Sequence, residues 1–264
     1  MVGTELVKRL AEVAWSNVRE GYYSRWLSLE PPRPTPPSLK GVIERRRGRA
    51  VIAEVKYSSP ISGRLVKDPM DPLVTVEKML KGGAAGLSIL TEPQLFNGDI
   101  STMRLVANEF DVPLLMKDVI VSPIQIEAGR NAGASAVLLI MRLFDRGFCG
   151  DPLEEMISRA KELGLEVVLE THGVAEFERA LDYDVEMIGI NNRDLDSFTV
   201  SLDVSSEVLR RVKPRGRLMI SESGISTASD IRRLREAGAD AFLVGTSIMT
   251  SSDIEGKVRE LVEA

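Results

Sequence analysis

The sequence predicts a single (β/α)8 barrel with an N-terminal helical extension. From residue 50 onward, short apolar segments typical of β-strands alternate with helical segments eight times along the 264-residue chain. A strand followed each time by a helix indicates parallel strands joined by helical crossovers, and eight such units is the number that closes a barrel. The predicted strands are 50–56, 86–91, 114–117, 136–142, 166–170, 187–191, 217–221 and 241–245.

An open, doubly wound sheet is the competing architecture. No predicted strand is followed by the G-x-G-x-x-G pattern that is typical of such sheets. The barrel is therefore the preferred fold.

The first 40 residues precede the barrel and are predicted to pack on it. The segment EPPRPTPPSL at 30–39 contains too much proline for a helix or a central strand, so we expect an extended strap there. The chain is divided into an N-terminal helix and proline-rich strap over 1–40 and a barrel catalytic domain over 41–264. The residues expected along one face of the N-terminal helix are Leu6, Leu10, Val13 and Asn17.

Several helices of the barrel have clear start and stop signals. Asp71, Ser122 and Asp151 each precede a proline, which is the order of a cap residue and a first helical residue. Ser122 and Asp151 also have capping-box spacing to Gln125 and Glu154. Glycines stand where left-handed helix ends are expected, at Gly82, Gly83, Gly133, Gly164 and Gly238.

Composition excludes several classes of protein. A net charge of −5 and an aromatic content of only 5% argue against a nucleic-acid partner, so we interpret the basic run 45–47 as solvated surface. The single cysteine, Cys149, and single histidine, His172, exclude an intramolecular disulfide and Cys/His zinc clusters. Charges throughout the N-terminal segment favour neither a signal peptide nor a membrane span, so we expect a cytoplasmic protein without a membrane partner.

Six apolar segments end in a polar or charged residue. Ionic groups at the ends of buried strands cost free energy unless they converge on a ligand or on one another. In parallel α/β proteins the carboxyl ends of the strands carry the chemistry, so the pattern predicts a catalytic bowl. The residues are Lys56, Lys117, Glu170, Asn191, Glu222 and Thr246.

The charged members of this bowl favour general acid–base catalysis. Glu54 and Lys56 lie two residues apart, so their side chains share the interior face of their strand. Considered without the other charged residues, these two could equally form a structural ion pair. Lys117, Glu170 and Glu222 reach the same level from other strands, which favours catalysis. Such groups titrate together and can provide one acid and one base. A Schiff base on either lysine stays open as an alternative.

The last two loops after strands are predicted to bind phosphate. They contain small residues, at 221–225 after the seventh strand and 245–249 after the eighth. Backbone N–H groups can approach a phosphate there, as they do in many barrels. We therefore expect a small phosphorylated substrate.

Two further loops could complete the bowl. The segment 57–70 is long enough to cover the mouth as a lid that bends at Gly63, although it could be only a long surface loop. The segment 91–99 places Phe96 where it could pack on a ring, although Asn97-Gly98 is also a good turn.

Taken in order, five motifs resemble indole-3-glycerol phosphate synthases, a family of barrel enzymes in tryptophan biosynthesis. The resemblance runs from about residue 40 to the end of the sequence, and the N-terminal helix is similar to the extra helix of that family. The motifs are E-V-K-x-x-S-P at 54–60, S-I-L-T-E-x-x-x-F-N-G-D at 88–99, M-K-D-V-I at 116–120, G-I-N-N-R-D-L at 189–195 and S-E-S-G-I at 221–225.

The resemblance implies ring closure of 1-(2-carboxyphenylamino)-1-deoxyribulose 5-phosphate with loss of carbon dioxide and water, and without a cofactor or metal. Lys117 would be the general acid that protonates the ribulose carbonyl oxygen. Glu170 would assist the dehydration, and Lys56 lies close enough to exchange acid and base roles with it. Glu54 would orient the lysines and the sugar hydroxyls.

The same resemblance assigns the substrate contacts. Asn191, Glu222 and Ser223 would hold the reacting portion. Ser59 and Lys56 would help to hold the anionic groups, and Arg193 would also bind the substrate. Phe96 and Leu138 would contact the aromatic ring, and Gly224, Gly245 and Thr246 would meet the phosphate through their backbone N–H groups.

The chain departs from the family pattern at two positions. Tyr57 stands where many relatives have arginine, and Val119 stands where phenylalanine is common. His172 follows Glu170 by two residues and points the same way; we interpret it as a supporting or loop residue rather than a proton shuttle.

Two other functions remain open. One is another phosphosugar barrel enzyme, either an isomerase or a Schiff-base aldolase. The other is a non-catalytic phosphate-binding barrel. For the leading function we expect a monomer.

Overall fold

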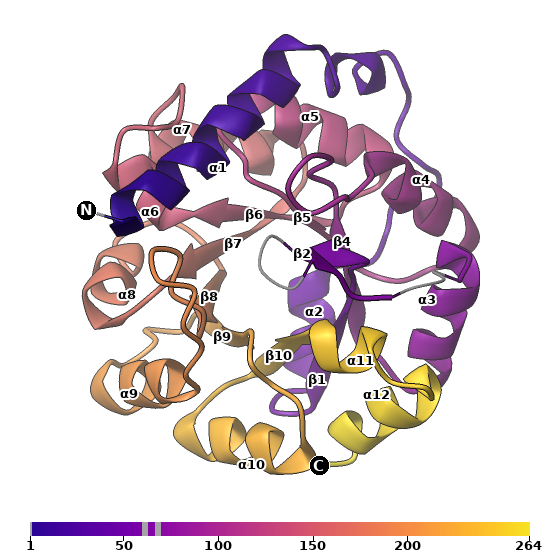
Figure 1. The fold of residues 1–264 in the computed structure, drawn as a ribbon, viewed down its shortest axis with the longest axis vertical. Helices are drawn as coiled ribbons and strands as arrows, with labels where there is room; N and C mark the ends of the chain where they lie inside the picture. Colours follow the sequence, from indigo (N-terminus) through magenta and orange to yellow (C-terminus); the bar gives the residue numbers. More distant parts are fainter. Residues whose placement is uncertain (1, 60–62, 67–69) are drawn as a thin grey trace.

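The computed structural model describes residues 2–59, 63–66 and 70–264, and its main feature is a closed parallel barrel. Strand β1 pairs with both β4 and β10, which closes the ring seen in Figure 1. The predicted (β/α)8 barrel is confirmed and the open sheet is excluded by this closure. The barrel strands are β1 (Ala50–Val55), β4 (Gly86–Leu90), β5 (Leu114–Lys117), β6 (Ala136–Ile140), β7 (Glu166–Thr171), β8 (Met187–Asn191), β9 (Leu218–Glu222) and β10 (Ala241–Val244).

Helices cover the outside of the barrel (Figure 1). Within the described ranges, none of them is long and apolar enough to cross a membrane. In chain order the helices are α1 (Val2–Arg19), η1 (Ser24–Trp26), α2 (Leu39–Arg45), α3 (Pro72–Lys81), α4 (Ile100–Glu109), α5 (Pro123–Ala132), α6 (Met141–Asp145), α7 (Leu153–Glu162), α8 (Val174–Ala180), α9 (Asp203–Arg211), α10 (Ala228–Ala237), α11 (Thr246–Met249) and α12 (Ile254–Val262).

Strand β1 shows how the barrel places its polar residues. Ala50 and Ile52 belong to the hydrophobic cluster of the barrel interior, whereas Val51 and Ala53 pack in the cluster shared with the outer helices. Since side chains alternate along a strand, the inward series continues to Glu54. The alternation that places Ala50 and Ile52 in the core therefore also places the Glu54 carboxylate at the carboxyl-terminal end of the barrel interior.

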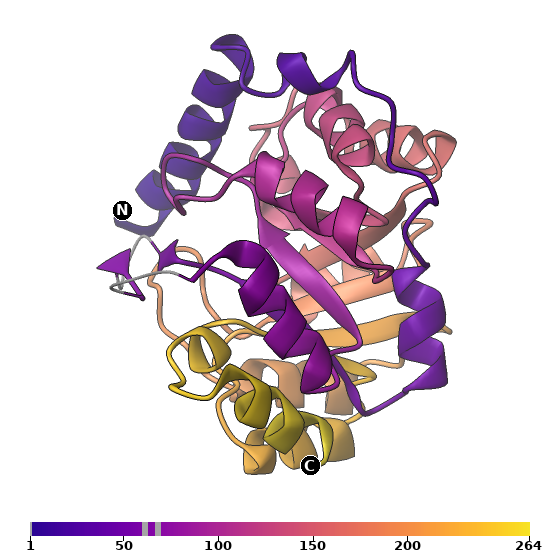
Figure 2. The same cartoon turned by 90° about the vertical axis from the view of Figure 1, so that its right-hand side faces the viewer.

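The two ends of the barrel are covered by different segments. Helix α2 closes the amino-terminal end, where Leu39 and Ile43 are fully buried against the interior cluster. Figure 2 shows α2 at one end of the barrel, with α1 and the hairpin β2–β3 at the opposite end. The predicted boundary after residue 40 falls inside α2, and the division into extension and barrel domain stays a prediction.

Helix α1 is bound to the loop that follows β4. The Asn17 side chain donates to Glu92 Oε1 at 2.8 Å and accepts from Gln94 Nε2 at 2.6 Å. Tyr22 Oη donates to the carbonyl oxygen of Thr91 at 3.1 Å. The bonds of Asn17 satisfy buried polar groups and hold α1 against this loop, and the bond of Tyr22 holds the segment that follows α1.

Two of the three predicted helix caps are confirmed. Asp71 Oδ1 accepts from a backbone N–H of α3, and Ser122 forms a capping box with Gln125 at the start of α5. The prediction for Asp151 is wrong. Pro152 keeps an extended ψ of 154° and becomes the residue before α7, so the helix starts one residue later without a side-chain cap. The left-handed helix ends are confirmed at Gly83, Gly133, Gly164 and Gly238.

The loop predicted as a lid contains a short antiparallel hairpin. Its strands are β2 (Ser58–Ser59) and β3 (Gly63–Arg64), and the Leu65 N–H donates to the carbonyl oxygen of Tyr57 at 2.9 Å. Residues 60–62 and 67–69, which include much of the predicted lid, lie outside the described residues.

Candidate functional site

A cavity of about 470 Å³ opens at the carboxyl ends of the strands. This volume is in the range of small-molecule sites. Most of the residues predicted from the sequence line it: Glu54, Lys56, Phe96, Lys117, Glu170, Asn191, Arg193, Glu222, Ser223, Gly224, Gly245 and Thr246.

Lys117 is at the centre of the charged part of this cavity. Its Nζ donates to Glu170 Oε2 at 2.8 Å and lies 3.5 Å from Glu222 Oε2. The lysine side chain is 17% exposed, and both glutamate side chains are 1% exposed. Strands β5, β7 and β9 thus bring three ionisable groups together inside the bowl.

Burial and charge compete in setting the pKa values of this group. Burial opposes the charge of Lys117, but the carboxylates of Glu170, Glu222 and Glu54 outweigh it and raise the lysine pKa above its usual range. Burial also opposes ionisation of Glu170, but Lys117 and His172 outweigh it and lower the pKa of Glu170. We therefore expect Lys117 to be protonated and Glu170 to be ionised throughout the neutral pH range.

Glu222 behaves differently from Glu170. Both of its carboxyl oxygens are buried and have no hydrogen-bond partner among the residues that the structure describes. Burial raises the pKa of Glu222 further than Lys117 can lower it, and the negative charges of Glu170 and Glu54 add to the rise. Two adjacent carboxyls with separated pKa values are the arrangement that supplies an acid and a base at one pH.

Gly189 makes the space that Glu222 occupies. A Cβ built on Gly189 of strand β8 would lie 2.1 Å from Glu222 Oε1 and 3.4 Å from Val168 Cγ1. A glycine inside a strand marks such a close approach. Gly189 is therefore a residue of the site that reasoning from the sequence missed. A glycine inside a buried strand was a signal that could have identified it.

Replacing Gly189 with alanine is expected to displace the Glu222 carboxyl. We expect a loss of about 1 to 3 kcal/mol in unfolding free energy from overpacking. We also expect kcat/KM to fall by about tenfold to a hundredfold, because a misplaced group at a reacting centre is costly. Urea unfolding and steady-state kinetics would measure the two effects.

Gly173 provides the matched control for this substitution. Among described residues, no atom lies within 4 Å of a Cβ built at Gly173, and its φ of 161° is extended backbone that any residue adopts. Gly173→Ala should keep both stability and kcat/KM near wild type. If Gly189→Ala behaves like this control, the steric role assigned to Gly189 is wrong.

Glu54 and Lys56 form a second ion pair at the rim, with Lys56 Nζ 3.3 Å from Glu54 Oε1. Glu54 also accepts from the Ser88 hydroxyl at 3.4 Å. A Cβ on Gly245 would lie 2.7 Å from Glu54 Oε1. The absence of a side chain at Gly245 thus makes room for Glu54, whatever its backbone N–H binds.

The loops expected to hold phosphate have an unusual backbone. Ser223 has a φ of 65°, which is rare for a residue other than glycine, and Gly224 has a φ of 78°. A Cβ on Gly224 would lie 2.5 Å from Val200 Cγ1. The short helix α11 begins at Thr246, directly after β10. Phosphate binding by these loops stays a prediction.

The loop after β8 carries the polar residues of the G-I-N-N-R-D-L motif. Asn191 Oδ1 accepts from the Arg193 N–H at 3.0 Å, and Arg193 Nη1 donates to the carbonyl oxygen of Phe198 at 3.4 Å. Phe198 has a φ of 60° and lines the cavity with Arg193. No periodic pattern in the sequence points to Phe198, because this residue lies in an irregular loop.

One predicted substrate residue, Leu138, does not line the cavity. Leu138 is fully buried in the barrel interior below it. Ile140, two residues further along β6 on the same face, takes that place, together with Leu10 of helix α1. Ser59 lies in β2, and its side chain is outside the described residues.

Asp118 follows Lys117 but turns toward the N-terminal segment. Its carboxyl group accepts from Tyr23 Oη at 3.0 Å and from the Val119 N–H at 2.7 Å. Burial raises the pKa of Asp118 to about 7, although the hydroxyl of Thr91 lowers it. Asp118 and Val119 both line the cavity, whereas Tyr57 packs against the outer core.

His172 lies directly behind Glu170 and does not line the cavity. Its side chain is fully buried, with Nε2 3.2 Å from Glu170 Oε1 and Nδ1 3.1 Å from Glu176 Oε2. This place agrees with the predicted supporting role.

Comparison with protein families identifies the chain's relatives. Residues 8–261 match the family model described as indole-3-glycerol phosphate synthase. The chain is 40% identical over 237 residues to an indole-3-glycerol phosphate synthase of Haloarcula marismortui, covering 87% of this chain and 84% of that protein. It is 37% identical over 235 residues to the protein of the same name from Roseiflexus castenholzii, covering 86% of each.

Solved structures of lower similarity share the fold. The 3-hexulose-6-phosphate synthase of Salmonella typhimurium superposes with a TM-score of 0.62 at 14% identity, covering 81% of this chain and 97% of that chain. At this identity the likeness concerns the barrel alone.

Proposed function

The chain belongs to the indole-3-glycerol phosphate synthase family, and we propose that its bowl carries out this reaction with Lys117 and Glu170 as the central proton-transfer groups. The chain acts in tryptophan biosynthesis as a carboxy-lyase on a small phosphorylated substrate. The observation that supports the residue assignment is the buried contact of Lys117 with Glu170 inside the cavity.

The reaction needs proton transfer at two stages. In the first stage, the ring carbon that bears the carboxylate attacks the ribulose C2 carbonyl, and the carbonyl oxygen takes a proton. Loss of carbon dioxide returns the bonding electrons to the ring and restores its aromaticity. In the second stage, the new hydroxyl leaves as water while a proton is lost from C1, which gives the indole.

Lys117 is suited to the first stage. Its charge is held in a buried site, where it stabilises the oxyanion that develops on the carbonyl oxygen. The proton moves when that oxygen becomes more basic than the amine, and Glu170 stabilises the charged lysine until then.

Glu170 is suited to the second stage. It is held ionised by Lys117 on one oxygen and His172 on the other, so it can accept the proton from C1. Glu222, whose pKa is raised by burial, can donate to the departing hydroxyl. The pair thus divides into a base and an acid.

The charge balance of the cavity favours an anionic substrate. Three cationic side chains line it, namely Lys56, Lys117 and Arg193, against the carboxyl groups of Glu54, Asp118, Glu170 and Glu222. Burial raises the pKa of Asp118 to about 7 and that of Glu222 to about 8, so the cations outnumber the ionised carboxylates at neutral pH. We propose that Lys56 and Arg193 meet the substrate carboxylate, and that the backbone at Gly224 and Gly245 meets the phosphate.

The Schiff-base alternative is disfavoured by the charge state of Lys117. A lysine attacks a carbonyl only as the neutral amine, and the surrounding carboxylates raise the Lys117 pKa away from that form. Borohydride treatment with substrate should therefore leave no adduct on Lys117.

Indole fluorescence provides the direct test of the function. Purified protein mixed with 1-(2-carboxyphenylamino)-1-deoxyribulose 5-phosphate should produce an indole signal and release carbon dioxide in equal amounts. Tight binding of this compound without either product would contradict the proposed use of the bowl.

We also propose a cytoplasmic monomer as the working form. The single cysteine suits a reducing compartment. Light scattering at working concentration would check the monomer.

A further inference from the structure

His172 is the one histidine of the chain, and its surroundings suggest a specific task. Nε2 faces Glu170 Oε1 at 3.2 Å, and Nδ1 faces Glu176 Oε2 at 3.1 Å. A neutral imidazole would turn a lone pair toward one of these oxygens, whereas the protonated ring presents an N–H to each. The Nε2 contact lacks good hydrogen-bond geometry, so its attraction depends chiefly on charge.

Glu176 is itself held in place from two sides. Glu176 Oε2 accepts from the His172 backbone N–H at 2.9 Å, and Glu176 Oε1 accepts from Arg142 Nε at 2.8 Å. Arg142 in turn donates to Asp194 Oδ2 at 3.0 Å. Negative and positive groups therefore alternate along a series of contacts that starts at β7 and passes through α8 and α6 to the loop after β8: Glu170, His172, Glu176, Arg142 and Asp194.

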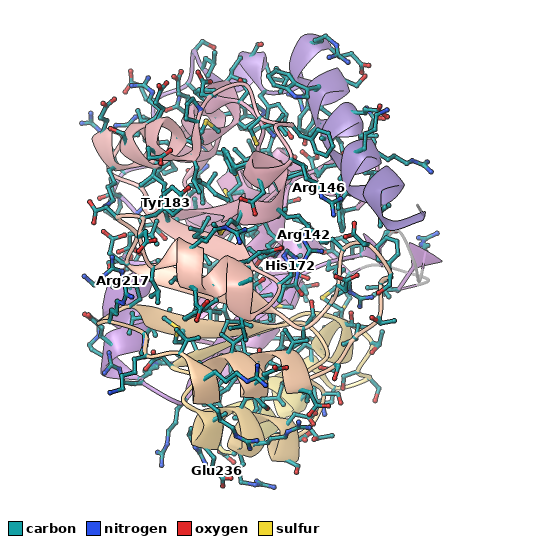
Figure 3. All side chains as sticks on the ribbon, turned by 90° about the vertical axis from the view of Figure 1, so that its left-hand side faces the viewer. Arg142, Arg146, His172, Tyr183, Arg217 and Glu236 are labelled. Carbon is teal, nitrogen blue, oxygen red and sulfur yellow. The ribbon has the colours of Figure 1, made fainter. Side chains whose placement is uncertain are left out.

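Figure 3 shows Arg142 and His172 near each other beside helix α8, with Arg146 next to them. Arg146 Nη2 contacts Asp196 Oδ2 at 2.7 Å. This ion pair is a second contact between α6 and the loop after β8, in addition to that of Arg142 with Asp194. That loop carries Arg193 and Phe198 on the cavity wall. The position of Glu170 is therefore linked to a loop that lines the cavity.

We propose that His172 is a positioning residue for Glu170, an imidazole held between two carboxylates that fixes the Glu170 side chain beside Lys117 and links it through Glu176 and Arg142 to the loop after β8. This role rests on the proposed function of Glu170. His172 does not contact the cavity, so it acts through Glu170 and not on the substrate.

The charge state follows from the groups that face the ring. Burial opposes protonation, but the carboxylates of Glu170 on β7 and Glu176 on α8 outweigh it and raise the pKa of His172 to about 9. Lys117 lies beyond Glu170, and Arg142 lies beyond Glu176, so the cations are one group removed. A folded-state pKa above the usual 6.5 means that the stabilising contact is complete below about pH 6.5 and is lost as pH rises through about 9.

NMR measures this pKa without any activity assay. Because the chain has one histidine, the imidazole signals of untagged protein belong to His172 without further assignment. We expect a titration midpoint well above 6.5 in wild type and a lower midpoint in Glu176→Gln, which neutralises one of the two facing carboxylates. A wild-type midpoint at or below 6.5 would overturn the proposal.

Kinetics separate positioning from a structural role. For His172→Gln we expect kcat to fall by about tenfold to a hundredfold with little change in KM, because substrate contacts remain while Glu170 is misplaced. Titrations of groups other than His172 affect both proteins alike, so they cancel in the ratio of wild-type kcat to variant kcat. It should fall as pH rises through about 9; a ratio that stays constant from pH 6 to 10 would contradict the role of the charged ring.

A double-mutant cycle and a control complete the test. If Glu176 acts through His172, Glu176→Gln should change kcat in wild type and have no further effect in His172→Gln; additive effects would contradict the link.

Arg179→Gln is the matched control, because it breaks an ion pair of the same helix with Asp145 and should leave the pH profile unchanged. If wild type makes no indole, the proposed function fails, while the NMR midpoint still decides the charge state of His172.

Discussion

Replacing Lys117 with methionine is expected to lower kcat by about three to four orders of magnitude, as expected for loss of a general acid together with its buried charge. Methionine fills nearly the same volume, so the barrel core stays packed. The change leaves Glu170 and Glu222 facing each other without the cation that lies 2.8 Å and 3.5 Å from them. Loss of the cation removes the main attraction that offsets the burial of Glu170, so we expect the pKa of Glu170 to rise.

Single-turnover measurements would locate the defect in Lys117→Met. Because carbonyl protonation precedes decarboxylation, both carbon dioxide release and indole formation should slow by the same factor. Lys56→Met is the comparison, since it also removes a cation from the rim but contacts Glu54 instead of Glu170. It should raise KM more than it lowers kcat. A Lys117→Met protein whose kcat stays within about tenfold of wild type would exclude the general-acid role.

The sequence predicted the bowl well because strand periodicity determines both the core and the mouth. Glu54 and Lys56 continue the inward series of β1. Lys117 and Glu222 end β5 and β9, and Glu170 is the next-to-last residue of β7. Side-chain alternation and closure of the barrel are sufficient to bring these groups together. No knowledge of loop conformation was needed.

The error at Leu138 shows the limit of the same reasoning. The predicted strand extended to residue 142, whereas β6 ends at Ile140 and α6 begins directly afterwards. At the true end of the strand, the inward residue next to the cavity is Ile140, and Leu138 lies one layer deeper. An apolar run does not reveal where a buried strand becomes a helix, because both are hydrophobic there.

Side-chain contacts between different βα units could not be predicted at all. Arg142 reaches Glu176 and Asp194 across 34 and 52 positions of sequence, and neither spacing follows a helix or strand period. The close approach of Gly189 to Glu222 likewise depends on the register of β8 against β9. These features require the three-dimensional arrangement of neighbouring βα units.

Replacing Glu170 with glutamine is expected to slow the reaction after decarboxylation. Glutamine keeps the size and a hydrogen-bond acceptor for Lys117 but cannot take a proton from C1. We expect indole formation to slow by about two to four orders of magnitude, the range for loss of a general base. Carbon dioxide release should slow much less, so a single turnover should show carbon dioxide appearing before indole.

The same variant tests the electrostatics of the buried cluster through stability. Lys117 and His172 lower the pKa of Glu170 in the folded protein, so its ionised form stabilises the fold above its unfolded pKa of about 4.3, and this contribution is lost as pH falls through the lower folded value. The difference in unfolding free energy between wild type and Glu170→Gln should therefore be largest near neutral pH and shrink in acid. Glu166→Gln on the same strand is the control, because Glu166 contacts Ser38 and the Lys40 N–H at the opposite end of the barrel. Equal slowing of both products in Glu170→Gln would instead place Glu170 with Lys117 in the first stage, since a carboxylate that only assists dehydration cannot delay the loss of carbon dioxide that precedes it.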